Sequence, residues 1–200
     1  MLLRIKKSAQ LLKKTRTLAV TGILIALSVV LEMCRIQITQ ELRVSFGFTA
    51  MAVIAMLYGP AAAVPAAIVG DLLGLVMNPS GGYFFGFTIT AMVSAMIYSA
   101  FFFDRSVPRH DLGKNFGHGM DPLGRANRSL LLRALGAKTL VNLVCNVGLN
   151  SLWLSMFYGQ TMRVLLPMRA AKNAILLVPE VIVLFFALKA AAYAYKQIDR

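Results

Sequence analysis

Two neighbouring apolar stretches of this sequence, within residues 137–157 and 165–180, each carry a line of polar side chains. The first has an asparagine at every fourth position, which places three amides on one face of an α-helix. These are Asn142, Asn146 and Asn150. The second has a cation, an amide and a carboxylate close to one helical face, namely Arg169, Asn173 and Glu180. Lipid offers no hydrogen-bond partner, so such lines must face protein, water or a ligand.

A second carboxylate and an indole are expected at the same depth. Asp71 interrupts another apolar stretch, and Trp153 continues the asparagine stripe. At about 1.5 Å per residue, Asp71 and Glu180 come to lie roughly 10–15 Å below one membrane surface, with the cations Arg169 and Lys172 above them. Carboxylates and amides can hydrogen-bond the edge of an aromatic heterocycle, aromatic rings can stack on it, and cations can hold an anionic tail. We therefore predict a water-accessible ligand pocket.

A purely structural role for these charges is the alternative. A carboxylate at the centre of a membrane helix costs at least about 2.5–3.5 kcal/mol and needs a reason to be there. Asp71 or Glu180 could simply be neutralised by Arg169 or Lys172, and the sequence leaves both interpretations open.

An uncharged, glycine-rich aromatic segment, NPSGGYFFGFT, occupies residues 78–88. Its candidate ligand contacts are Tyr83 and Phe84, and Tyr83 can stack on a ring. The segment can fold over a cavity or form an aromatic belt at the membrane interface, and the sequence favours neither. Arg43, near the end of the polar connection 35–44, is a further candidate on the same side.

The composition indicates a polytopic all-α membrane protein. Of 200 residues, 58% are hydrophobic and 14% are charged, which is unlike a soluble domain. The net charge of +13 comes from basic residues between apolar runs, so a cationic cytoplasmic face explains it better than nucleic-acid binding does. The two cysteines, Cys34 and Cys145, form no metal-binding or disulfide motif.

The apolar runs predict six transmembrane helices in one domain. A basic lead-in at 1–16 is expected to lie on the cytoplasmic leaflet. The helices are expected at about 17–34, 45–58, 60–77, 84–103, 130–158 and 170–195. A polar loop, 104–129, separates the fourth helix from the fifth.

The distribution of the 21 Lys and Arg residues predicts the orientation. Most of them lie in the lead-in, in the stretch from Arg105 to Lys138 and after Lys189. Both termini are therefore expected in the cytoplasm, and the basic loop 163–172 is expected outside.

Sequence motifs for other chemistry are missing. There is no P-loop, no H-E-x-x-H and no G-x-S-x-G, so we predict no ATPase, no enzyme activity, no catalytic residues and no cofactor. His110 and His118 lack the spacing of metal ligands, so no metal site is predicted. A stand-alone proton-coupled transporter using Asp71 and Glu180 remains an alternative.

The sequence resembles the substrate-binding (S) components of energy-coupling factor (ECF) transporters, and among them the folate-specific members. The stretches that carry this resemblance are GPAAAVPAAIVGDLLG (59–74), PSGGYFFGFT (79–88), LNSLWLSMFYG (149–159) and LLPMRAAKNAILLVPE (165–180). Gly22 and Ala26 form the small-xxx-small pair expected on helix 1, although family members usually show alanine at the first position. The 104–129 loop departs from the family pattern.

The resemblance implies a prokaryotic plasma-membrane subunit that captures folate with high affinity outside the cell. It also implies docking, through Gly22 and Ala26, on a transmembrane coupling subunit that carries two ATPase subunits. Riboflavin or thiamine would be the ligand if the vitamin differs from the folate expected here.

Overall fold

A computed structural model describes residues 2–34, 36–37, 43–77, 84–103, 125–159 and 161–198. These residues are almost entirely helical, which confirms the predicted all-α class. The elements are α1 (Leu2–Leu12), α2 (Thr15–Met33), β1 (Ile36–Gln37), β2 (Arg43–Val44), α3 (Gly47–Tyr58), α4 (Pro60–Met77), α5 (Phe85–Phe102), α6 (Arg125–Val141), η1 (Asn142–Leu149), α7 (Asn150–Tyr158) and α8 (Met162–Ile198). The two short strands pair antiparallel, with Ile36 opposite Val44.

Five helices of the described chain are long and apolar enough to cross a membrane. They are Thr15–Met33, Pro60–Met77, Phe85–Phe102, Arg128–Phe157 and Leu165–Tyr195. The remaining predicted span, at 45–58, corresponds to α3. This helix has 12 residues and is therefore about 18 Å long, whereas the hydrocarbon core of a membrane is roughly 30 Å thick. The prediction of six transmembrane helices is thus supported for five.

The short helix α3 lies at the centre of the helical packing. Nearly all of its side chains are buried, and it contacts α2, α4, α5 and α8. It ends at Gly59, whose φ of 78° favours glycine and where a Cβ would lie 2.8 Å from the ring of Phe103. Pro60 then starts α4, at the position where its missing N–H costs nothing.

The basic lead-in begins as a helix, α1, that folds back onto the turn between α3 and α4. Ser8 is fully buried, donates a hydrogen bond to the carbonyl of Tyr58 and accepts one from the amide of Ala61. Lys6, Lys13 and Lys14 are exposed. The lead-in is therefore attached to the bundle, while its charges face outward.

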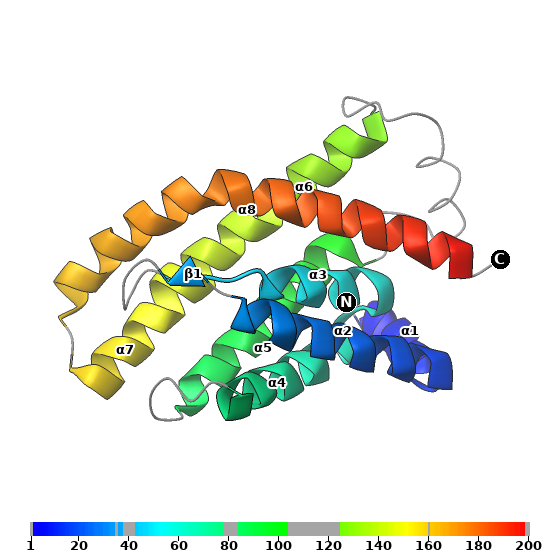
Figure 1. Ribbon diagram of the computed structural model, residues 1–200, viewed down its shortest axis with the longest axis horizontal. Coiled ribbons are helices and arrows are strands. Elements are labelled where there is room, and N and C mark those ends of the chain that lie inside the picture. The colour runs from blue at the N-terminus through cyan, green and yellow to red at the C-terminus, as the bar shows by residue number, and fades with distance from the viewer. Residues whose placement is uncertain are drawn as a thin grey trace.

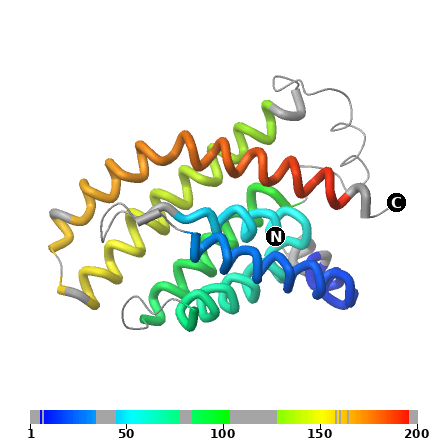
Figure 2. Tube along the Cα trace, viewed as in Figure 1, coloured from blue at the N-terminus to red at the C-terminus, as the bar shows by residue number. Residues whose placement is uncertain are grey.

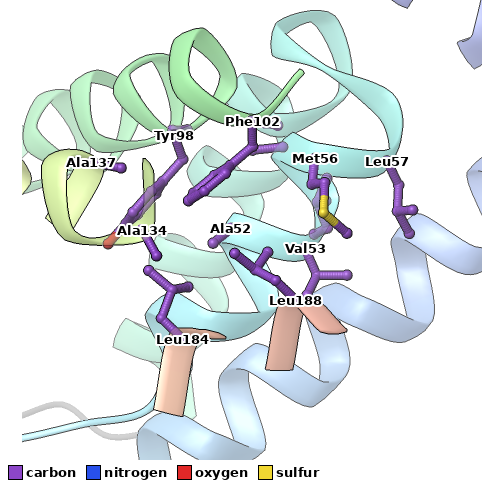
Figure 3. Close-up of a cluster of buried hydrophobic side chains, with 14 of the residues drawn as sticks. Ala52, Val53, Met56, Leu57, Tyr98, Phe102, Ala134, Ala137, Leu184 and Leu188 are labelled. Atoms are coloured by element: carbon purple, nitrogen blue, oxygen red, sulfur yellow. The ribbon is translucent and has the colours of Figure 1, made fainter. Parts of the chain in front are cut away.

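The largest core forms where α3, α5, α6 and α8 meet (Figure 3). Tyr98 and Phe102 of α5 stack with ring centroids 6.2 Å apart. Small side chains of α6, Ala134 and Ala137, and Leu184 of α8 surround the ring of Tyr98 (Figure 3). This core holds the long C-terminal helices against the first part of the chain.

The fifth predicted helix is one continuous rod of three elements, α6, η1 and α7, and α8 runs beside it (Figures 1 and 2). The middle element is a π-helix, and such widened turns are frequent at functional sites.

Helix α8 begins at Met162 rather than near 170, so the expected basic loop 163–172 is helical. It continues through Pro167 and Pro179, each of which removes one backbone bond, and Figure 1 shows it bowed. Similarly, α6 begins at Arg125, so the last residues of the predicted loop 104–129 are helical and its first part lies outside the described residues.

Candidate functional site

A line of cross-helix hydrogen bonds joins the α6–η1–α7 rod to α8, and we call it the polar ladder. Its members are Glu180, Asn142, Asn146, Asn173 and Arg169. Asn142 donates to Glu180 Oε2 at 3.2 Å, and Asn146 donates to Asn142 Oδ1 at 2.9 Å. Asn146 also donates to Asn173 Oδ1 at 3.4 Å. The polar lines expected from the sequence on these two helices therefore do meet.

At its Arg169 end, the ladder is closed by hydrogen bonds to backbone carbonyls of α8 and η1. Arg169 donates from Nη1 to the carbonyl of Asn146 at 3.2 Å. Asn173 donates to the carbonyl of Arg169 at 2.8 Å. These side chains are half-buried, as is Lys172 on the same stretch of α8. The facing sides of the α6–η1–α7 rod and α8 thus combine amides, a carboxylate and cations within two candidate membrane spans.

The buried carboxylate Glu180 is paired with a cation that the sequence analysis assigned to the cytoplasmic side. Lys138 Nζ lies 3.3 Å from Glu180 Oε2, and only 3% of the Lys138 side chain is exposed. The ammonium also lies 3.4 Å from the centroid of the Phe48 ring. Lys138, which was counted among the basic residues of the cytoplasmic stretch, is therefore buried between helices, within the candidate span Arg128–Phe157.

Asp71 belongs to a different polar contact from Glu180. Its Oδ2 accepts a hydrogen bond of 2.7 Å from Thr88 Oγ1, which joins α4 to the first turn of α5. Asp71 is half-buried. The two carboxylates expected at one depth thus have separate partners, a hydroxyl for Asp71 and an ammonium for Glu180.

Three aromatic side chains, which we call the aromatic cluster, lie where α5 begins beside α7. They are Phe84, Trp153 and Phe157. The ring of Phe84 is centred 5.6 Å from that of Trp153 and 5.4 Å from that of Phe157. The indole N–H of Trp153 donates to Thr90 Oγ1 at 3.0 Å. A bond at one edge and a ring against one face fix the Trp153 side chain.

Asn150, the third asparagine of the stripe, does not join the ladder through a bond within the described chain. Its Oδ1 is buried and has no hydrogen-bond partner among the described residues. A buried acceptor without a partner is costly, which makes it a candidate ligand contact. Tyr83 lies outside the described residues. Arg43 lies in β2, and its side chain is outside the described part of the structure.

The small-xxx-small pair of the first predicted transmembrane helix lies on an exposed face of α2. Gly22 and Ala26 are both exposed, and nothing lies within 4 Å of a Cβ built on Gly22. Their neighbours Ile23 and Val30 are also exposed, by 68% and 54%. Within the described chain, this face is therefore open to lipid or to another protein.

The sequence analysis missed three residues that complete the site. They are Lys138, Thr88 and Thr90. Lys138 stands four residues before Asn142, so it extends the asparagine stripe by one step, and that spacing could have identified it. The two threonines carry no such signal, because hydroxyls in membrane helices usually bond their own backbone.

Comparisons with known proteins agree with this architecture. A family model described as "ECF transporter, substrate-specific component" matches residues 16–196. A protein called "Folate transporter FolT" from Clostridium novyi (strain NT) is 29% identical over 189 residues, covering 94% of this chain and 93% of that protein. Another of that name from Leuconostoc mesenteroides subsp. mesenteroides is 36% identical over 144 residues, covering 72% and 66%. A solved structure, "Crystal structure of FolT bound with folic acid", matches with a TM-score of 0.69 and 28% identity over 86% of this chain and 92% of that one.

Proposed function

We propose, since the chain belongs to the family of ECF transporter substrate-specific components, that it binds folate between the α6–η1–α7 rod and α8. The observation that carries the proposal is the polar ladder, which lies within two membrane spans and ends beside half-buried cations. Relatives named as folate transporters, and a related structure described as bound to folic acid, support this choice of vitamin.

The chemistry of folate suits these side chains. The pterin ring carries hydrogen-bond donors and acceptors at its edge, which amides and carboxylates can bind. The unpartnered Asn150 Oδ1 offers one such acceptor, and the aromatic cluster offers a flat apolar surface. The glutamate tail is anionic, and Arg169 and Lys172 on α8 supply the cations to hold it.

In this proposal the pocket faces outward and both termini are cytoplasmic. The exposed lysines of α1 then lie on the anionic leaflet. Phe84 contributes to the aromatic wall of the pocket, and Tyr83 and Arg43 are further proposed ligand contacts. Binding is of high affinity, so that the vitamin is captured at low external concentration.

The exposed face of α2 is proposed to dock on a transmembrane coupling subunit through Gly22 and Ala26. Small residues let two helices approach closely, which is how helices associate in lipid. The coupling subunit would carry two ATPase subunits that supply the energy. This chain would then supply specificity and no ATP hydrolysis.

Uptake of labelled folate by cells tests the proposal. Cells that express this chain with a coupling subunit and two ATPases should accumulate folate, whereas cells with this chain alone should not. Accumulation without the partners would instead support a stand-alone proton-coupled transporter. Accumulation of labelled riboflavin or thiamine by the same cells, with none of labelled folate, would overturn the assignment of the vitamin.

A further inference from the structure

Lys138 and Glu180 are the only charged side chains that are buried in the part of the chain whose side chains the structure describes. Lys138 projects from α6 into the space between α8 and α3, with Glu180 at 3.3 Å and the Phe48 ring at 3.4 Å. Such a pair is expensive to desolvate, and apolar residues of similar size often serve stability as well. The pair therefore calls for an explanation other than stability.

In the hydrogen bonds that lead from Asn146 through Asn142 to Glu180, each residue donates to the next one towards Glu180. An ionised carboxylate only accepts, so the Asn142 amide must turn its N–H group towards it and its Oδ1 away. That Oδ1 in turn accepts from Asn146 Nδ2. Asn146 uses its N–H groups on Asn142 and Asn173, so Oδ1 is the atom that it can offer to a ligand.

We infer that Lys138 is a positioning residue for the ligand pocket: by holding the Glu180 carboxylate beside Asn142, it fixes the direction of the amides of the polar ladder. This inference rests on the proposed function, because it assumes that folate meets the ladder. Lys138 does not touch the ligand itself. It acts through Glu180 and Asn142, and Asn146 then presents an acceptor to the pterin ring.

Loss of the ammonium should reverse the ladder. Without Lys138, no ammonium holds Glu180 Oε2 at the position where it accepts from Asn142. The Asn142 amide is then free to turn over, and Asn146 turns with it. The ligand would meet an N–H group where it had met an acceptor, so both affinity and discrimination between ring patterns should change.

The test compares folate with methotrexate, which carries a ring amino group where folate carries a ring carbonyl. Each is titrated into purified full-length protein, with the fluorescence of Trp153 as the readout. Lys138→Met should weaken folate binding by roughly tenfold or more and change the ratio of the two affinities. Lys189→Met is the matched control: it removes a lysine from α8, nine residues beyond Glu180 and away from the ladder, and should leave both affinities unchanged.

A second variant separates positioning from a general folding defect. In Lys138→Met with Glu180→Gln, no buried charge remains, and the glutamine carbonyl can hold the Asn142 amide in its original direction. The double variant should recover folate binding to within about threefold of wild type, and the original affinity ratio. Unchanged binding by Lys138→Met, or an equal loss for both ligands without recovery in the double variant, overturns the positioning role. A wild-type protein that binds neither ligand overturns the proposed function itself and removes the basis of this inference.

Discussion

Several hydroxyls of α2, α3 and the middle of α5 bond back to their own helix, whereas polar side chains of α6 and η1 reach across to α8. Ser28, Thr49, Ser94 and Ser99 each donate to a carbonyl three or four residues earlier. In the C-terminal helices, Asn142 and Asn146 instead reach Glu180 and Asn173 on α8.

This difference distinguishes a scaffold, formed by α2, α3 and α5, from a candidate site, formed by α6, η1 and α8. A hydroxyl that bonds its own helix is satisfied locally and makes no demand on its neighbours. A cross-helix ladder depends on the placement of two helices, and it includes buried charges that must be matched. The first part of the chain can therefore pack through small apolar residues, while the C-terminal pair carries the specificity.

The largest expected effect comes from breaking the ladder at its charged end. Glu180→Ala leaves Lys138 as a buried cation without its carboxylate, which should lower the free energy of unfolding by about 3–5 kcal/mol. Folate binding should be lost as well, because Asn142 loses its acceptor. Thermal unfolding in detergent and folate titration measure the two effects. A variant with wild-type stability and affinity would show that the ion pair contributes to neither.

A bulky residue on α2 should block assembly with the coupling subunit and leave stability and folate binding intact. Ala26 is exposed on α2, so Ala26→Trp should fold and bind folate normally but fail to co-purify with the coupling subunit. Val76→Trp is the control, because Val76 is 75% exposed on α4 and lies outside the proposed interface. Retained assembly by Ala26→Trp would remove α2 from the docking surface.

A moderate effect is expected where the scaffold supports the aromatic cluster. A Cβ on Gly86 would clash with the rings of Phe84 and Trp153, so Gly86→Ala must displace both rings. Overpacking of this kind costs about 1–3 kcal/mol, and we expect roughly tenfold weaker folate binding. Gly74→Ala is the matched control, because no atom lies within 4 Å of its Cβ. Equal affinities for the two variants would contradict a role of the cluster in binding.

The smallest effect is expected at the other carboxylate. Asp71→Asn keeps an oxygen that can accept from Thr88, so the α4–α5 contact should survive with a stability change below about 1 kcal/mol. Folate affinity should change less than about threefold, by the same titration. A loss as large as that of Glu180→Ala would show that Asp71 meets the ligand directly.

The sequence predicted most of the fold because hydropathy and turn residues act locally. Gly59 and Pro60 mark the turn between α3 and α4, and α4 begins and ends where the apolar run does. The start of α8 was misplaced, because Pro167 and the basic residues around it are typical of a loop. Packing against the α6–η1–α7 rod keeps this segment helical.

The site was predicted in part, for a related reason. The asparagine stripe and the α8 line follow from helical periodicity, and the ladder contains the α8 line with two of the three asparagines, Asn142 and Asn146. The burial of Lys138 was not predicted, because the positive-inside rule treats every lysine near a span as solvated. Its burial depends on Glu180 and Phe48, which are distant in sequence, so no local pattern reports it.

Titration of the purified protein with folate tests the central claim most directly. Trp153 is the only tryptophan of the sequence and belongs to the aromatic cluster. We predict saturable quenching of its fluorescence by folate at sub-micromolar concentration, and none by riboflavin or thiamine. A response to riboflavin or thiamine but not to folate, or no response to any of the three, would contradict a folate pocket between the α6–η1–α7 rod and α8.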